Sequence, residues 1–201
     1  MTEGLHAINL MGAAGGPFNF SLPPGTAMAI TGPSGAGKSV LLRMVADLDP
    51  HQGTVRLHGI DRASQPAPVW RRRVAYLAAE PGWWHEQASA HFPHREQAEI
   101  LMPALALAPA LLDQPVHRLS TGERMRLALI RTLLNQPTVL LLDEPTGALD
   151  PLSTTLVESV LAERLRQGLI LILVTHDTNQ AGRLGAERWH LDAGRLTPIT
   201  P

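Results

Sequence analysis

Three runs of mainly hydrophobic residues stand out along the chain, at 27–31, 139–142 and 169–175. They do not alternate with polar residues, which is typical of strands that are buried on both faces. The stretches at 38–47, 122–135 and 154–167 instead have helical spacing of their hydrophobic positions. This succession of strands and helices predicts an α/β fold around a mostly parallel sheet.

Two regions depart from this pattern. The first quarter contains short alternating segments at 5–10, 18–22 and 54–57 separated by Gly and Pro turns, which predict an antiparallel β-layer. A further strand is predicted at 74–79. From about 81 the chain becomes rich in proline and histidine, with a helical stretch at 95–107. We interpret 81–135 as a small helical subdomain inserted into a single domain that spans 1–201.

Composition narrows the class of protein. The 201 residues are 44% hydrophobic and 17% charged, as in globular domains, and the net charge of −1 favours no general attraction to nucleic acid. The lack of cysteine excludes disulfides, thiolate metal sites and cysteine nucleophiles. No hydrophobic run has the length of a membrane-spanning helix, and the N-terminus lacks the basic region of a signal peptide. We therefore expect a soluble chain without a nucleic-acid partner.

A phosphate-binding motif follows the first hydrophobic run. The sequence matches G-x-x-x-x-G-K-[ST] at every fixed position. Glycines let backbone amides approach an anion closely, and the start of the next helix offers unpaired amides. The motif predicts that Lys38 contacts the β- and γ-phosphates and that the Ser39 hydroxyl binds Mg²⁺. The predicted nucleotide-binding residues are Gly32, Pro33, Ser34, Gly35, Ala36, Gly37, Lys38, Ser39 and Val40.

Two carboxylates end the second hydrophobic run. Asp143 is predicted to hold Mg²⁺, and Glu144, on the opposite side of the strand, is suited to polarise an attacking water molecule. A kinase does not need the second carboxylate, because its nucleophile is a substrate hydroxyl. The pair therefore favours a hydrolase over a kinase.

The order of motifs carries a resemblance to a known family. The phosphate loop is followed by Leu-Ser-Thr-Gly-Glu at 119–123, by Asp143 and Glu144, by Ala-Leu-Asp at 148–150 and by His176. With these motifs the chain resembles the ATPase subunits of ATP-binding cassette (ABC) transporters over roughly residues 5–196. Independently of the family, Ser120 and Glu123 have the spacing of a capping box that opens a helix.

The resemblance implies a function shared between two subunits. In this family two copies pack head to tail around two ATP molecules, and the signature residues of one copy contact the ATP of the other. Carried over to this chain, those residues are Ser120, Thr121, Gly122 and Glu123, where Thr121 and Glu123 replace the more usual Gly and Gln. The resemblance also implies catalytic roles for Glu144, His176 and Lys38, and an interface role for Asp150, for which a helix N-cap is the alternative.

The implied partners are a second copy of the chain and an integral membrane permease, and the cofactors are ATP and Mg²⁺. The expected location is cytoplasmic, on the inner face of the cell membrane. The alternative functions are a soluble ABC-type ATPase with a role in assembly or regulation, or an ATP-binding module with weak hydrolysis. Transport is favoured because the chain carries no second cassette and no coiled-coil insertion.

Two positions depart from the family pattern. Ala79 stands where the family has a glutamine that touches the metal, and Glu80 is the candidate replacement. The aromatic residue that stacks on adenine is missing near residues 10–12, with Phe18 as a substitute, so we expect relaxed discrimination between ATP and GTP.

The segment after Glu80 carries further candidates. We predict that Trp83 and Trp84 face the membrane partner. Three nearby histidines, at 85, 91 and 94, have no regular spacing, which favours a structural role over a metal site.

Overall fold

The computed structural model describes residues 3–199 and contains two sheets. The first, sheet A, is antiparallel with strand order β2-β1-β4-β5, and the second, sheet B, has the order β10-β9-β3-β8-β7-β6. In sheet B all neighbours are parallel except β9 and β10. The strands are β1 (Leu5–Gly12), β2 (Gly15–Leu22), β3 (Ala27–Thr31), β4 (His51–Leu57), β5 (Ile60–Asp61), β6 (Val74–Leu77), β7 (Val139–Asp143), β8 (Ile170–Val174), β9 (Glu187–Asp192) and β10 (Arg195–Pro198).

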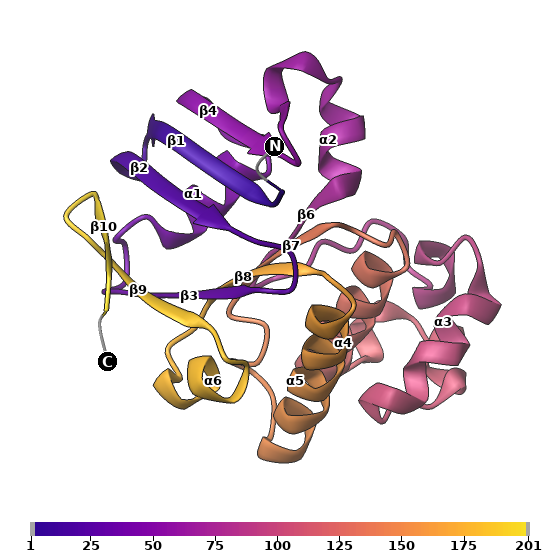
Figure 1. Ribbon diagram of the computed structural model, residues 1–201. Helices are drawn as coiled ribbons and strands as arrows, with labels where there is room; N and C mark the ends of the chain where they lie inside the picture. The colour runs from indigo at the N-terminus through magenta and orange to yellow at the C-terminus, as the bar shows by residue number, and fades with distance from the viewer. Residues whose placement is uncertain (1–2, 200–201) are drawn as a thin grey trace.

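Helices cover both faces of sheet B (Figure 1). Helix α1 lies between the two sheets, and α4 and α5 pack on the opposite face of sheet B. The α-helices are α1 (Lys38–Val45), α2 (Ala67–Arg73), α3 (Arg95–Leu101), α4 (Thr121–Leu133), α5 (Pro151–Arg166) and α6 (Thr178–Arg183), and five 3₁₀ helices are η1 (Arg62–Ser64), η2 (Ala88–His91), η3 (Met102–Leu105), η4 (Pro109–Asp113) and η5 (Val116–Arg118). None of the helices within residues 3–199 combines the length and the hydrophobicity of a membrane-spanning segment.

The continuous hydrophobic strands divide their side chains between two cores. In β7, Leu140 and Leu142 join a core with α4 and α5, while Val139 and Leu141 join a core with α1 and sheet A. β8 alternates in the same way. A strand that is buried on both faces needs hydrophobic residues at every position, which explains the runs in the sequence.

Most predicted elements are found, and two boundaries were wrong. The helix predicted at 95–107 ends at Leu101 and continues as η3, because Pro103 lacks the amide hydrogen that an α-helix requires. The strand predicted at 74–79 ends at Leu77, so Ala79 and Glu80 lie in an exposed bend. The sequence prediction also missed α2, α6 and the hairpin of β9 and β10.

Candidate functional site

The phosphate loop connects β3 to α1. Gly37 is the N-cap of α1 with φ of 95°, a left-handed conformation that glycine adopts without strain. Gly32 has φ of 147°, and a Cβ there would lie 2.1 Å from the carbonyl oxygen of Leu191 in β9. The backbone path therefore requires glycine at both positions. Because α1 begins directly after the loop, its first amides have no intrahelical partners and are available to an anion.

Lys38 is buried beneath this loop. Its Nζ donates hydrogen bonds to the carbonyl oxygens of Gly32 (2.8 Å) and Pro33 (2.9 Å). The ammonium group thus lies inside the curve of the loop, where its charge and the helix N-terminus both favour an anion. The outer wall of the loop borders a hollow of about 460 Å³ whose other side is formed by residues 13–15 and 192–194.

Strand register places the acidic pair beside the loop. Asp143 pairs with Val174 of β8, and Val174 pairs with Ile30 of β3, two residues before Gly32. The carboxylate of Asp143 is buried and accepts a hydrogen bond of 3.1 Å from the hydroxyl of Tyr76 in β6. Burial raises the pKa of Tyr76, and the charge of Asp143 adds to the shift. Sequence reasoning missed Tyr76, because nothing in a four-residue strand indicates which side chain reaches a neighbouring carboxylate.

Glu144 and His176 meet across the ends of β7 and β8. His176 Nε2 lies 2.8 Å from Glu144 Oε1, and both side chains are partly exposed. Glu144 has φ of 50° although it is not glycine, and its amide donates to the carbonyl oxygen of Val174. Such a conformation is uncommon for a residue with a side chain and is often found at functional sites.

The predicted signature opens α4 as a capping box. The Ser120 hydroxyl accepts a hydrogen bond from the Glu123 amide, and Glu123 Oε2 accepts from the Ser120 amide and hydroxyl, both at 2.8 Å. Arg124 donates to Leu119 and to the Thr121 hydroxyl beside it. The capping-box prediction is confirmed, and the helix start carries both a carboxylate and a guanidinium.

Asp150 is the N-cap of α5. It accepts hydrogen bonds from the amide (2.9 Å) and hydroxyl (2.6 Å) of Ser153, which hold its pKa below the ordinary value. Ser153 also accepts from Arg126 of α4. The N-cap interpretation is therefore confirmed, and an additional role at an interface stays a prediction.

Phe18 and Glu80, the two substitutes for missing family residues, lie in different surroundings. Phe18 is 1% exposed and packs in the core with sheet A, so the prediction that it stacks on adenine was wrong. The side chain of Phe18 points into the core because buried and exposed residues alternate along the second half of β2. Glu80 is exposed and lies in the bend that follows β6. A role for Glu80 as a metal ligand stays a prediction.

The two tryptophans after Glu80 have different surroundings. Trp83 packs against the core and Trp84 is 66% exposed, while the guanidinium of Arg131 lies 4.7 Å from both rings. Buried His91 lies edge-on to both rings, and burial lowers its pKa. Trp84, His91 and Arg131 border a hollow of about 500 Å³ between β6, α4 and the residues that follow α1.

The oxygen donors suit Mg²⁺ bound together with a phosphate. In the part of the chain that the structure describes, no three His, Asp or Glu side chains are grouped as a metal site. A hydroxyl and one carboxylate are the few protein ligands expected for Mg²⁺, which keeps several waters and uses substrate phosphates. Ser39 and Asp143 fit that requirement.

Comparison with known proteins identifies relatives of similar length and longer ones. The probable iron export ATP-binding protein FetA of Escherichia coli is 37% identical, covering 81% of this chain and 77% of that protein. The lipoprotein-releasing system ATP-binding protein LolD of Maricaulis maris is 36% identical, covering 91% and 87%. Protein STAR1 of Oryza sativa subsp. japonica is 35% identical over 91% of this chain, which spans only 56% of that protein.

Solved structures and a family model agree on the fold. The dimeric, post-hydrolysis state of the ATP-binding cassette MJ0796 bound to ADP and Pi superimposes with a TM-score of 0.84 and 23% identity, covering 98% of this chain and 99% of that one. The predicted α/β P-loop fold, with its antiparallel layer, is thereby confirmed. A family model described as "ABC transporter" matches residues 16–147, which is more than half of the chain. The chain belongs to the ABC transporter family.

Proposed function

We propose that this chain is the ATP-hydrolysing subunit of an ABC transporter. The observation that carries the proposal is the meeting of the phosphate loop, Asp143, Glu144 and His176 at the carboxyl edge of sheet B. Ligands of parallel sheets bind at this edge. The amides of the loop and Lys38 would bind the phosphates of ATP, and Glu144 would accept a proton from the attacking water. His176, in contact with Glu144, would orient the γ-phosphate.

Ser39 and Asp143 are the residues proposed to hold Mg²⁺. The ion would neutralise charge on the phosphate oxygens during transfer. Tyr76, through its hydrogen bond to Asp143, would fix one oxygen of that carboxylate so that the other faces the nucleotide.

The second half of each site would come from another copy of the chain. The amide of Gly122, in the first turn of α4, has no intrahelical partner and favours an anion. The Ser120 hydroxyl would contact that anion by turning its hydrogen away from Glu123. Asp150, exposed at the start of α5, would lie at the same interface. ATP would therefore close a head-to-tail dimer, and its hydrolysis would reopen it.

A membrane permease is the proposed further partner. The hollow bordered by Trp84 and Arg131 would receive it, and the subdomain at 81–135 would transmit the movement. The chain would then work in the cytoplasm on the inner face of the membrane. The names of FetA and LolD, iron export and lipoprotein release, illustrate the range of cargo among relatives.

Steady-state ATP hydrolysis tests the catalytic proposal. Glu144→Gln and Lys38→Ala should each lose nearly all turnover, and Glu163→Gln, an exposed change on α5, should keep it. Wild-type turnover in both of the first two variants would refute the assignment. Co-purification with a multi-span protein from detergent extracts distinguishes transport from a soluble ATPase role.

A further inference from the structure

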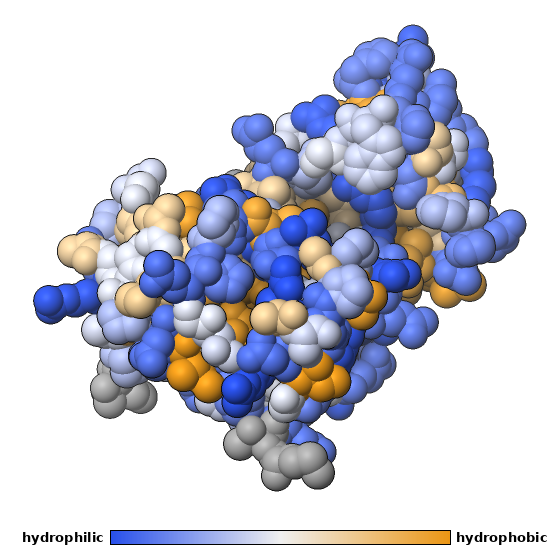
Figure 2. All heavy atoms as spheres, turned by 90° about the horizontal axis from the view of Figure 1, so that it is seen from above, coloured by the Kyte–Doolittle hydropathy of each residue, from blue (hydrophilic) through white to orange (hydrophobic). Residues whose placement is uncertain are grey.

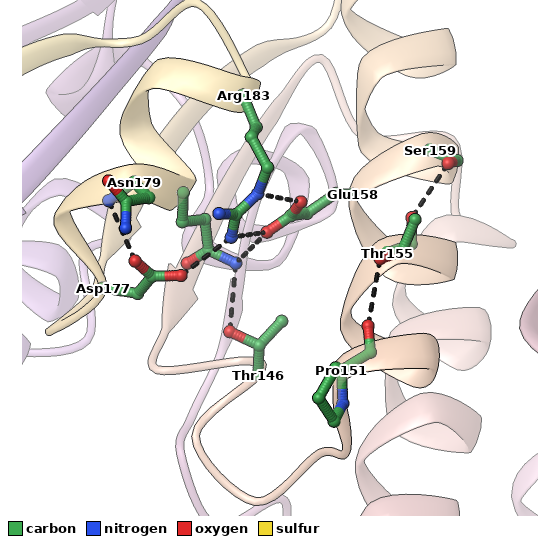
Figure 3. A network of polar contacts seen from close by, with 9 residues as sticks. Thr146, Pro151, Thr155, Glu158, Ser159, Asp177, Asn179 and Arg183 are labelled. Atoms are coloured by element: carbon green, nitrogen blue, oxygen red, sulfur yellow. Dashed lines mark hydrogen bonds and ion pairs between the residues drawn. The ribbon is translucent and has the colours of Figure 1, made fainter.

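A polar network joins helix α5 to the two segments that follow Glu144 and His176 in the chain. It is shown in Figure 3, where side chains from the turn after β7, from α5 and from α6 converge. None of its members belongs to the phosphate loop or the signature. Its members are Thr146, Glu158, Asp177, Gln180 and Arg183.

The centre of the network is Glu158, a buried carboxylate on α5. Arg183 donates to it twice, from Nε to Oε2 (2.6 Å) and from Nη2 to Oε1 (2.7 Å), and Gln180 Nε2 donates to Oε1 (3.0 Å). A buried charge is tolerated only when it is paired and hydrogen-bonded, and a two-point guanidinium contact also fixes orientation. Helix α6 is thus held at a defined place on α5.

The network reaches His176 on one side. Arg183 Nη2 also donates to Asp177 Oδ2 (2.7 Å), the residue directly after His176. The Asp177 amide donates to the hydroxyl of Thr175, the residue directly before His176. The backbone on both sides of His176 is therefore fixed, although the side chain of His176 itself is 59% exposed.

On the other side the network reaches Glu144. Gln180 Nε2 donates to the hydroxyl of Thr146 (3.0 Å), and Thr146 belongs to the turn closed by the hydrogen bond from the Gly147 amide to the Glu144 carbonyl oxygen. Gln180 is fully buried and its Oε1 has no partner among the described residues. If packing alone mattered, an apolar side chain would suit this buried position better than Gln180. We therefore infer that Gln180 is needed for the two hydrogens of its Nε2, which it donates to Thr146 and Glu158.

We propose that Gln180, Glu158 and Arg183 are positioning residues that set the distance between His176 and Glu144, with Thr146 as the point of attachment. This inference rests on the proposed function, since it assigns a task to the residues that surround the proposed catalytic pair. It goes beyond that function because these residues are not among the groups proposed to bind the nucleotide or to activate water. Displacement of a catalytic group by about 1 Å can lower a rate about 100-fold, so a small loosening is measurable.

Thr146→Val tests the proposal with a minimal change. It removes the hydroxyl that receives the Gln180 amide and leaves the ion pair between Glu158 and Arg183 intact. We expect kcat for ATP to fall about tenfold with KM unchanged, because the phosphate loop is untouched. Thr146→Ser, which restores the hydroxyl, should return kcat to within about twofold of wild type. Thr155→Val on α5 is the matched control, since its hydroxyl bonds only within the helix (Figure 3), and it should leave kcat unchanged.

Arg183→Lys is the second variant. Lysine keeps the charge but cannot contact Glu158 at two points and Asp177 at the same time. Folded protein, measured by circular dichroism, should remain while kcat falls.

The inference is overturned if Thr146→Val keeps wild-type kcat, if it raises KM alone, or if its loss of rate equals its loss of folded protein. Glu144→Gln in the same assay separates the two proposals. If Glu144→Gln abolishes turnover while Thr146→Val keeps wild-type kcat, only the positioning role fails. If Glu144→Gln and Lys38→Ala both keep wild-type turnover, both proposals fail.

Discussion

Replacing Glu123 by glutamine should strengthen ATP-driven dimerisation. In the structure one oxygen, Oε2, accepts from both the amide and the hydroxyl of Ser120. The amide oxygen of glutamine has two lone pairs and can accept the same two bonds. The substitution therefore keeps the capping box and removes one negative charge from the helix start that would face the partner's ATP.

The magnitude follows from the geometry of the capping box. The Ser120 hydroxyl lies 2.8 Å from the Glu123 carboxylate. A phosphate oxygen that took this hydroxyl hydrogen in place of the carboxylate would lie about 3 Å from Ser120 Oγ, so the two negative charges would be separated by about 5 Å. Their repulsion is about 1 to 3 kcal/mol for an effective dielectric constant between that of water and about 20. Arg124 offsets part of it, so we expect each of the two ATP sites to tighten dimerisation about 5- to 30-fold.

Sedimentation velocity measures this effect. Every protein compared, with or without Glu123→Gln, would carry Glu144→Gln so that ATP persists. The dissociation constant of the dimer would be measured in MgATP titrations at two salt concentrations. Glu96→Gln is the matched control, because Glu96 is in the first turn of α3. Like Glu123→Gln, it removes one negative charge and one favourable interaction with a helix dipole. Equal constants for Glu123→Gln and Glu96→Gln, or a gain that does not shrink with salt, would refute the electrostatic reasoning.

Three further predictions concern stability. Tyr76→Phe removes a hydrogen bond to a buried carboxylate and should lower the free energy of unfolding in urea by about 1 to 3 kcal/mol at pH 7, and equal stability would show that water replaces the hydroxyl. Burial lowers the pKa of His91, so the unfolded chain binds more protons, and stability should decline as pH falls below about 6.5. His91→Phe should flatten that decline in thermal melts between pH 7.5 and 5.5. Trp70→Ala should lower the free energy of unfolding by about 3 to 5 kcal/mol, because the ring is 0% exposed and its Nε1 donates to a carbonyl oxygen of α1. Trp84→Ala, at an exposed ring, should lower it by less than about 1 kcal/mol.

The sequence indicated those parts of the molecule that depend on neighbours in the chain. β3, β7 and β8 were predicted because double-sided burial requires unbroken hydrophobic runs, and the phosphate loop is a contiguous motif. β9 was missed because it is half-exposed and carries polar residues at most positions. Contacts such as Tyr76 to Asp143, or Arg183 to Glu158, join residues far apart in the chain, and no local pattern encodes them.

The described residues on the face of the molecule shown in Figure 2 form no single large hydrophobic patch. Figure 2 shows hydrophobic side chains in small separate spots between polar ones on one face of the molecule. Isolated spots are normal on a soluble surface and do not identify an interface. The inference about Trp84 therefore depends on the hollow that it borders and on the resemblance to a family with membrane partners.

The strand order of sheet B has a consequence for synthesis on the ribosome. β3, which precedes the phosphate loop, has β8 and β9 as its two neighbours, and both are translated long after it. Until they emerge, β3 has no parallel partner and the loop has no wall from β9 against which Gly32 packs. We expect a nascent chain that stops before β8 to be unable to retain nucleotide. Competence to bind ATP would then arise only after β8 and β9 have both been translated.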